Sequence, residues 1–298
     1  MDDNQQLILT VLCTTFNHAN YVRDCLEGIV MQKCNYRWEA VIHDDASTDG
    51  TQMIIQEYAE KYPEIIKPIF QKENLFSKKD GSLRRVLMES CRGKYIANLE
   101  GDDYWIDPLK LQKQIDYLEN HPECGLVRTN FNRLYQTSGK LEQGMFDGMQ
   151  EMSDTLRDYL LNARFAGPCT WVYRAEYDTE RRLLPTEKYF NGDLTLLLEV
   201  CRESSIHYIE DVTAVYRILD SSVSHMKSHV KTLELLIRLK NTRILYAKKE
   251  SLLFKFKLWN RLCRSYRLKY RLAGRSRDWL RMCVEDFWEL FFIPNRIF

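Results

Sequence analysis

The strongest constraint on the fold is an alternation of short apolar runs with amphipathic segments in the first 122 residues. Between the apolar runs, apolar residues recur at helical spacing, as in Val22, Leu26 and Ile29. Strands that alternate with helices predict an α/β fold, with a mainly parallel, Rossmann-like sheet flanked by helices. The runs short enough to be buried strands are 7–13, 38–43, 65–70 and 94–99.

The rest of the chain is predicted to add strands at 167–174 and 206–218 and a helix that begins at Asp193. From about residue 228 the pattern is helical, basic and aromatic to the end. We therefore expect one α/β domain over residues 1–225 and a helical, basic extension over residues 226–298.

Polar loops follow three of the predicted strands, at 14–20, 44–51 and 100–107. The carboxyl ends of parallel strands meet at one edge of a sheet, and open α/β sheets bind their ligands there. The three loops are therefore expected to open on the same edge. Asn20 at the end of the first loop is expected to cap the helix that follows.

The third loop gathers Glu100, Asp102 and Asp103 directly after a predicted strand. Adjacent carboxylates raise one another's pKa unless a cation compensates them. A hard divalent ion such as Mg²⁺ or Mn²⁺ would do so, since these ions prefer oxygen ligands. The alternative is that the acids are solvated loop charges. Asp107 before Pro108 is the pattern of a helix start, with Asp as the cap and Pro in the first helical position.

The second loop, at 44–50, reads DDASTDG and also follows a buried strand. An Asp in this position could accept a hydrogen bond from a nucleobase N–H. Asp, Ser and Gly are also common turn residues, so ordinary turn chemistry is the alternative. The combination of both acidic loops is more specific than either one.

Five segments of the chain together resemble the GT-A-fold glycosyltransferases of the large inverting family 2. They stand in the family's order within residues 7–217, and EGDDYW at 100–105 resembles one bacterial subset of the family. The segments are 13–32, 41–51, 93–122, 191–200 and 214–217.

The resemblance implies that residues 1–225 bind a nucleotide-sugar donor and carry the catalytic residues. It also gives individual residues expected roles. Phe16 and Asn17 correspond to the loop that borders the nucleotide. Asp45, together with Asp44, is expected to contact the base.

Asp102 and Asp103 stand at the family's Asp-x-Asp-type site, which touches the donor ribose and holds a divalent metal, Mn²⁺ or Mg²⁺, on the diphosphate. The family pattern has Asp where this chain has Glu100. We expect Asp103 to be the first metal ligand, followed by Asp102, with Glu100 last.

Asp193 resembles the acidic residue that deprotonates the acceptor hydroxyl, and it also fits a helix N-cap. Arg217 follows in the segment AVYR, and the histidine often found two residues later in the family is Leu219 here. Positive charge for the leaving group is therefore expected from Arg217, or from Arg84 or Arg85, for which a solvated surface position is the commoner reading.

Tyr104, Trp105 and Trp171 have two readings. Aromatic faces suit the C–H surfaces of sugars, so these side chains could line a sugar subsite. Core packing is the commoner use of an aromatic side chain.

The charge of the chain is unevenly distributed. Residues 227–281 hold 17 Lys and Arg against three acidic residues, whereas residues 1–226 hold 25 Lys and Arg against 36 acidic residues. A cation-rich amphipathic segment with Trp and Leu predicts contact with an anionic membrane surface; a helical cap on the catalytic domain is the alternative. The acidic body argues against nucleic acid as a partner.

The sequence therefore predicts a metal-dependent inverting glycosyltransferase that uses a UDP-sugar and a saccharide or polyprenyl-linked saccharide acceptor, in bacterial surface polysaccharide synthesis. A metal-dependent nucleotidyltransferase and a non-catalytic nucleotide-binding scaffold are the alternatives. Nine scattered cysteines without a Cys-x-x-Cys pair, and no basic leader or apolar run of membrane-spanning length, predict a cytoplasmic protein, either soluble or peripheral on the inner face of the membrane.

Overall fold

The computed structural model of the chain describes residues 6–147, 154–162, 167–178, 184–185, 187–190, 192–219 and 228–293. The chain divides into two compact units. Unit 1 comprises Met1–Ser153, Ala166–Leu183 and Glu203–Asp220, and unit 2 comprises Asp154–Phe165, Leu184–Arg202 and Ser221–Phe298.

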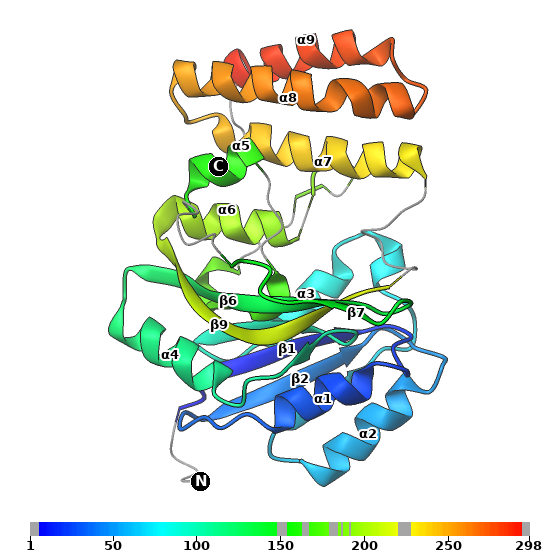
Figure 1. Cartoon of the computed structure of the whole chain (residues 1–298), viewed down its shortest axis with the longest axis vertical. Helices are drawn as coiled ribbons and strands as arrows, with labels where there is room; N and C mark the ends of the chain where they lie inside the picture. The colour runs from blue at the N-terminus through cyan, green and yellow to red at the C-terminus, as the bar shows by residue number, and fades with distance from the viewer. Residues whose placement is uncertain are drawn as a thin grey trace. The chain divides into compact units, whose positions relative to one another are not determined.

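Unit 1 is built on a β-sheet with the order β3-β2-β1-β4-β8-β6-β9-β5, and β7 pairs with β6 (Figure 1). Strands β1 to β4 are parallel to one another, as are β6 and β9, whereas β8, β5 and β7 are antiparallel to their neighbours. The strands are β1 (Leu9–Thr15), β2 (Trp38–Asp44), β3 (Ile66–Phe70), β4 (Tyr95–Glu100), β5 (Tyr104–Trp105), β6 (Cys124–Tyr135), β7 (Lys140–Glu142), β8 (Val172–Arg174) and β9 (Ser205–Ile218). The predicted α/β class is confirmed, and the sheet is mixed beyond β4.

The helices of unit 1 lie where hydrophobic periodicity predicts them. Alternate residues of β1, namely Leu9, Val11 and Cys13, are buried in one hydrophobic cluster with residues of α1, α2 and α4. This arrangement follows from the two-residue period of a strand, which directs every second side chain to the same face. The helices are α1 (Val22–Val30), α2 (Thr51–Lys61), α3 (Ser82–Ser90) and α4 (Lys110–Asn120), with short 3₁₀ turns η1 (Phe76–Lys78), η2 (Pro168–Thr170) and η3 (Ala175–Tyr177).

Two local predictions in unit 1 need correction. Asn20 does not cap α1: the helix begins after Tyr21 without a side-chain cap, and the carbonyl of His18 accepts the N–H groups of Tyr21 and Val22, both at 2.8 Å. The predicted strand 167–174 is a strand only in its second half, because η2 occupies the first half.

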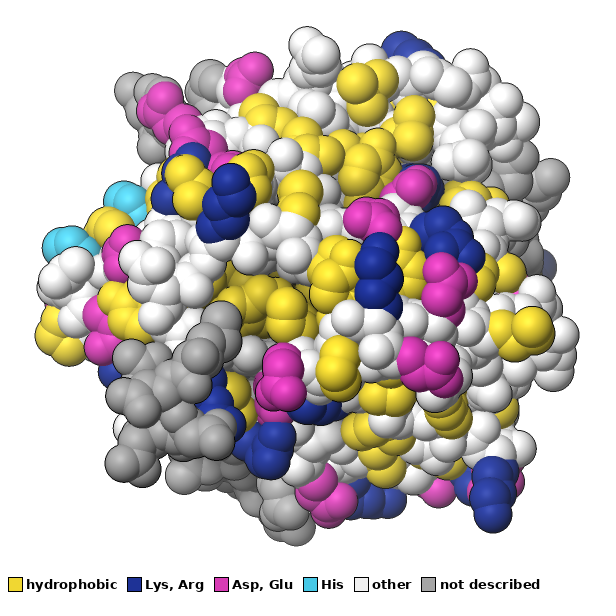
Figure 2. All heavy atoms as spheres, turned by 90° about the horizontal axis from the view of Figure 1, so that it is seen from below, with side chains coloured by type: hydrophobic (Ala, Val, Ile, Leu, Met, Phe, Trp, Pro, Cys, Tyr) yellow, Lys and Arg dark blue, Asp and Glu magenta, His cyan; other side chains and the backbone are white. Residues whose placement is uncertain are grey.

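The face of unit 1 that carries α1 and α2 mixes acidic, basic and apolar side chains (Figure 2). Arg23 of α1 forms a two-pronged ion pair with Glu57 of α2, with both N–O distances 3.0 Å. Because the two signs of charge lie next to each other there, this face forms no extended field of one sign.

Unit 2 is helical in its described residues: α5 (Leu156–Asn162), α6 (Asp193–Glu203), α7 (His229–Ala247), α8 (Leu252–Leu272) and α9 (Asp278–Phe291). Ser228 and Ser251 accept hydrogen bonds from the backbone N–H groups of Lys231 and Phe254, so they cap α7 and α8. Among the described residues, no helix combines the length and apolarity that crossing a bilayer requires.

The division into units differs from the single boundary at residue 226 expected from the sequence, because α5 and α6 pack with the C-terminal helices. Arg243 of α7 donates hydrogen bonds to the carbonyls of Leu160 (2.6 Å) and Leu161 (2.7 Å) at the end of α5. Tyr246 donates to the buried Glu199 of α6 at 2.5 Å.

Candidate active site

Three polar loops meet at one edge of the unit 1 sheet, as predicted. In the parallel register, Thr15 at the end of β1 pairs with Asp44 of β2, and Thr14 pairs with Glu100 of β4. The backbone continues these links past the strands, since the N–H of Gly101 donates to the carbonyl of Thr14 (2.9 Å) and that of Asp45 donates to Thr15 (3.0 Å).

The loop after β1 is held by the loop after β2. Asn17, at a φ of 56°, donates its N–H to Ser47 Oγ (2.8 Å) and accepts the N–H of Thr48 on Oδ1 (3.0 Å). Asn is one of the few residues that adopts this left-handed conformation readily. Asn17 therefore shapes the loop, and the side chain of the neighbouring Phe16 is 45% exposed.

Asp44 is buried and fully engaged. Its oxygens accept from Thr15 Oγ1 (2.9 Å), from the N–H and hydroxyl of Ser47 (2.9 and 2.5 Å) and from Gln52 Nε2 (2.7 Å). These bonds make Asp44 an organiser of the loop rather than a free acceptor for a nucleobase.

Asp45 is also buried, and each of its oxygens accepts one backbone N–H, from Leu75 (2.7 Å) and from Phe76 (3.0 Å). A carboxylate oxygen can accept a second hydrogen bond, so contact with a base N–H remains chemically open. The structure adds that Asp45 also positions the start of η1.

The third loop packs tightly on the first at Gly101. A Cβ on Gly101 would lie 2.5 Å from Thr15 Cγ2 and 2.9 Å from His18 Nδ1, closer than side chains approach one another. Only glycine fits here without a shift of the loop that carries Asp102 and Asp103. This requirement for glycine was not predicted from the sequence, although a glycine between two acids is a visible signal of it.

Asp102 and Asp103 have opposite environments. Asp103 is only 2% exposed, and its Oδ1 accepts the backbone N–H of Arg217 at 2.8 Å. Burial raises the pKa of the Asp103 carboxyl well above its usual range, and the charges of Asp102 and Glu100 raise it further. Asp102 is half-buried, and its carboxylate has no hydrogen-bond or ion-pair partner in the described part of the chain. The geometry thus favours Asp102, not Asp103, for direct contact with a ligand.

The residues present fit a divalent ion shared with a ligand. No group of three or more His, Cys, Asp or Glu side chains in the described residues is arranged to hold a metal alone. Mg²⁺-type sites commonly use only one or two carboxylates and complete their shell with substrate phosphates and water. The repulsion that raises the pKa of Asp103 is what a cation beside Asp102 would relieve.

Arg217 lies against this loop. It is 5% exposed and donates to the carbonyl of Asp102 (2.7 Å), and it pairs with Asp24 in the first turn of α1. Its guanidinium lies 4.6 Å from the ring centre of Tyr104 and 5.4 Å from that of Tyr21. Arg217 therefore clamps the acidic loop instead of facing a leaving group. The contacts of Asp24 and Tyr21 with Arg217 were not predicted from the sequence.

The other arginines considered for the leaving group are engaged locally. Arg84 forms an ion pair with the buried Asp178, and Arg85 is exposed and donates to the carbonyl of Asp80 at 3.2 Å.

Trp105 and Trp171 are fully buried, so the sugar-subsite reading is wrong for both and core packing is confirmed. Trp105 donates its indole N–H to the carbonyl of Cys169 at 2.8 Å. The ammonium of Lys110 lies 4.5 Å from the Trp105 ring centre and is completely buried. Burial lowers the pKa of Lys110 to about 7.

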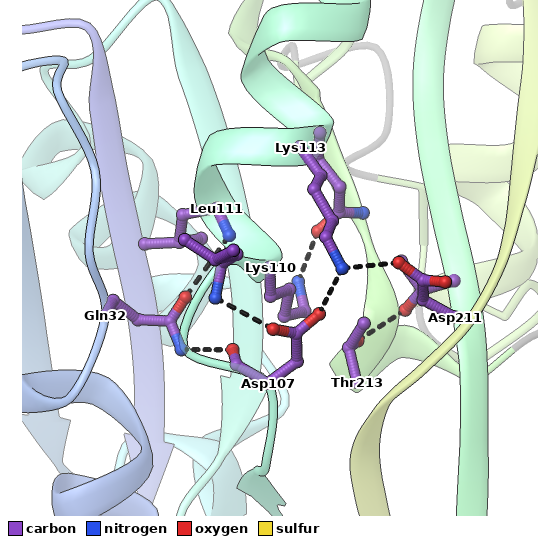
Figure 3. A network of polar contacts seen from close by, with 10 residues as sticks. Gln32, Asp107, Lys110, Leu111, Lys113, Asp211 and Thr213 are labelled. Atoms are coloured by element: carbon purple, nitrogen blue, oxygen red, sulfur yellow. Dashed lines mark hydrogen bonds and ion pairs between the residues drawn. The ribbon is translucent and has the colours of Figure 1, made fainter.

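Asp107 is architectural, although α4 begins at Lys110 rather than at Pro108. Its carboxylate accepts the N–H of Leu109 (2.9 Å) and pairs with Lys113 (2.8 Å), which also pairs with Asp211 (Figure 3). Gln32 donates to the Asp107 carbonyl at 2.9 Å. This network anchors the segment that follows the acidic loop.

Asp193 belongs to unit 2, where it is exposed and is the first residue of α6, as the sequence predicts. Thr195 receives the N–H of Gly192 on its hydroxyl at 2.9 Å. The start of α6 thus has a polar partner besides Asp193.

A family model named Glycosyl transferase family 2 matches residues 10–182. The chain belongs to glycosyl transferase family 2. The match includes the three polar loops and the two acidic segments that carry the resemblance.

Two relatives of this family 2 chain are similar to it over more than half of its length. An uncharacterized protein of Mycobacterium tuberculosis (strain ATCC 25618 / H37Rv) is 33% identical over 200 residues, which are 64% of this chain and 56% of that protein. The putative teichuronic acid biosynthesis glycosyltransferase TuaG of Bacillus subtilis is 28% identical over 225 residues, 75% of this chain and 84% of that protein. The matched region thus spans little more than half of the mycobacterial relative.

Solved structures show the same fold. S. aureus TarS 1–349 in complex with UDP-GlcNAc superposes with a TM-score of 0.67 at 18% identity, covering 98% of this chain and 83% of that one. The mannosyltransferase PcManGT from Pyrobaculum calidifontis, in complex with GDP-Man and Mn²⁺, gives 0.53 at 16% identity, covering 96% and 88%. The expected GT-A-type fold with C-terminal helices is confirmed.

Proposed function

We propose that this glycosyltransferase moves a sugar from a UDP-sugar to a saccharide or polyprenyl-linked saccharide hydroxyl, with inversion. One observation carries the proposal: the free carboxylate of Asp102 lies in the loop after β4, at the sheet edge that it shares with the loops after β1 and β2. An open α/β sheet binds its ligand at that edge. The ligands named for the structural neighbours, UDP-GlcNAc and GDP-Man, support a nucleotide-sugar donor.

The residues of unit 1 would each do a separate part of the binding. Phe16 presents an aromatic face to the base, and Asp45 offers it an acceptor. Asp102 would hold Mn²⁺ or Mg²⁺ with oxygens of the donor, while Asp103 fixes the loop behind it. The ion would offset the charge that develops on the leaving nucleoside diphosphate.

Asp193 is proposed as the general base for the acceptor hydroxyl. Inversion requires a base on the face opposite the leaving group, and a carboxylate can accept the proton there. The family resemblance supports this assignment, and the exposure of Asp193 leaves it accessible.

The proposed setting is the synthesis of bacterial surface polysaccharide, at the inner face of the cytoplasmic membrane. The name of the Bacillus relative, a teichuronic acid glycosyltransferase, supports the setting. The basic helices within 227–281 are proposed to bring the enzyme to an anionic membrane surface, where a polyprenyl-linked acceptor would lie.

A thermal-shift panel of nucleotides with and without Mn²⁺ tests the donor site. Ligand at 100 times its Kd stabilises the folded state by about 2.7 kcal/mol, so UDP with Mn²⁺ should raise the melting temperature by several degrees. Asp102→Asn should remove the Mn²⁺-dependent part of this shift, and Asp211→Asn, the same change elsewhere in unit 1, should keep it. No shift with any nucleotide would refute the proposal. A shift with GDP but not with UDP would show that the donor is not a uridine nucleotide.

Transfer is tested separately with Asp193→Asn. This variant should give the wild-type shift with UDP and Mn²⁺ but lose at least 100-fold in turnover, the scale of general-base catalysis. Wild-type turnover in this variant would exclude Asp193 as the base.

A further inference from the structure

Exposed large apolar side chains concentrate on the last two helices. Eleven such side chains are more than half exposed in the described residues, and nine of these belong to α8, α9 or the residue after α9. A large exposed apolar patch usually marks an interaction site. The nine are Leu252, Leu253, Phe256, Leu268, Leu272, Leu280, Val284, Trp288 and Phe292.

One end of the α8–α9 pair combines this apolar surface with cations. The two helices lie side by side (Figure 1), and a hollow of about 320 Å³ at one end is lined by Lys248, Lys249 and Lys255 together with residues 290–293. The first turn of α8 therefore lies beside the last turn of α9. We call this end the tip; it consists of Lys249, Leu252, Leu253, Lys255, Phe256, Lys257, Phe292 and Ile293.

The tip has uncompensated positive charge. Its neighbouring acids are already paired, since Glu250 binds Arg157 (2.9 Å) and Glu289 binds Lys248 (2.8 Å). By contrast, Lys249, Lys255 and Lys257 have no ion-pair partner within the described ranges, and Lys249 and Lys257 are exposed. Leu253, at the same end, is 82% exposed.

Much of the remaining basic composition of 227–281 is used inside unit 2. Lys240 forms a buried pair with Asp286, and Arg243 binds backbone carbonyls of α5. Arg275 and Arg281 pair with acids on α9. The overall charge of the segment thus overstates what its surface offers. In the described residues Arg271 and Arg277, near the exposed Leu272, also have no ion-pair partner, but the tip is where such cations and exposed apolar side chains border a hollow.

We infer that the tip docks onto an anionic phospholipid surface. Its leucines and phenylalanines would enter the boundary between head groups and acyl chains, and its lysines would neutralise lipid phosphates, one of which the hollow can accept. A second copy of the chain is a poorer partner, because a two-fold contact would set the same lysines against each other. The inference deepens the proposed function by naming which end of the basic helices meets the membrane.

The experiment is co-sedimentation of the full chain with vesicles of 70% phosphatidylcholine and 30% phosphatidylglycerol in 0.1 M NaCl. Lys249→Gln/Lys255→Gln should weaken partition about 30-fold, since each surface cation contributes about 1 kcal/mol. Leu252→Ser/Leu253→Ser should weaken it on the order of 100-fold. Vesicles of phosphatidylcholine alone should bind weakly.

Matched variants at the other end of α8 separate the tip from a helix lying flat. Sixteen residues of helix place Arg271 about 24 Å from Lys255. Arg271→Gln/Arg277→Gln and Leu268→Ser/Leu272→Ser should therefore keep wild-type partition. Equal losses in the tip and far-end variants would overturn the inference, and so would the absence of vesicle binding by the wild type.

Two further readouts complete the test. Sedimentation velocity should show one species; a dimer that the tip variants abolish, without vesicle binding, would assign the surface to a second copy and overturn the inference. The UDP and Mn²⁺ thermal shift should be unchanged in every tip variant. If a tip variant loses vesicle binding but keeps the thermal shift, the loss is specific to the tip. If the wild type shows no thermal shift, the proposed donor site is wrong, whatever the vesicle result.

Discussion

A lysine buried beneath the candidate site should give the protein a measurable pH dependence. The ammonium of Lys110 donates to Gln114 Oε1 at 2.6 Å and faces the ring of Trp105. Gln114 in turn donates to the carbonyls of Val127 and Thr170, both at 2.8 Å. Because burial lowers the pKa of Lys110 from 10.5 to about 7, the folded state holds this proton less tightly than the unfolded state.

The sign and size of the effect follow from linkage. Between pH 7 and 10.5 the unfolded chain binds more protons at this site, so the free energy of unfolding rises with pH over that window and is flat below it. Each pH unit contributes about 1.4 kcal/mol. Because Lys110 is only about half deprotonated at pH 7 in the folded state, the gain between pH 7 and pH 9 should be about 2 kcal/mol.

The assay is urea unfolding at pH 7 and pH 9 for the wild type, Lys110→Met and Lys113→Met. Lys110→Met should lose the gain of about 2 kcal/mol between the two pH values. Its absolute stability at pH 7 should change little, because removal of the buried charge offsets the loss of the donor to Gln114. Lys113, whose ion pairs raise its pKa, stays charged throughout, so its variant should keep the wild-type gain. Equal gains in Lys110→Met and the wild type would refute the reasoning.

Three other perturbations test the loop. Arg217→Ala should lower the free energy of unfolding by about 3 kcal/mol, because it removes a buried charge-assisted hydrogen bond to Asp102. Asp24→Asn should lower it by less than about 1 kcal/mol, since Asp24 is mostly exposed. Equal losses of the two variants in thermal unfolding would contradict the role of Arg217 as a clamp on the loop. Gly101→Ala should cost about 1–3 kcal/mol and weaken UDP binding in calorimetry, and unaltered affinity would show that the loop accommodates a methyl group. Asp45→Asn should cost about 1–2 kcal/mol, measured by urea unfolding, because it weakens two hydrogen bonds to η1; no loss would leave base contact as its main role.

The sequence predicted the edge of the sheet well because topology alone decides it. Parallel strands bring the ends of β1, β2 and β4 together whatever the side chains do, so the meeting of their loops required only the strand–helix alternation. The start of α6 at Asp193 was equally accessible to local reasoning, since helix starts depend on neighbouring residues.

The roles of individual acids could not be predicted from local sequence. Whether Asp102 or Asp103 is buried depends on Arg217, which lies 114 positions away from Asp103 and reaches it through β9. The contacts of α5 and α6 with α7 could not be predicted for a related reason, because these helices are separated in sequence.

The position of Arg217 also explains how three acids can share one loop without a cation. By fixing the backbone at Asp102 and donating an N–H to Asp103, the end of β9 turns one carboxylate inward and leaves the other accessible. Burial raises the pKa of Asp103 well above its usual range, whereas the half-buried Asp102 keeps an accessible carboxylate, so the two neighbouring acids take different roles. Arg217 thus leaves the carboxylate of Asp102 accessible to a ligand. The sequence predicted that Arg217 would neutralise the leaving group, whereas in the structure it holds the acidic loop in place.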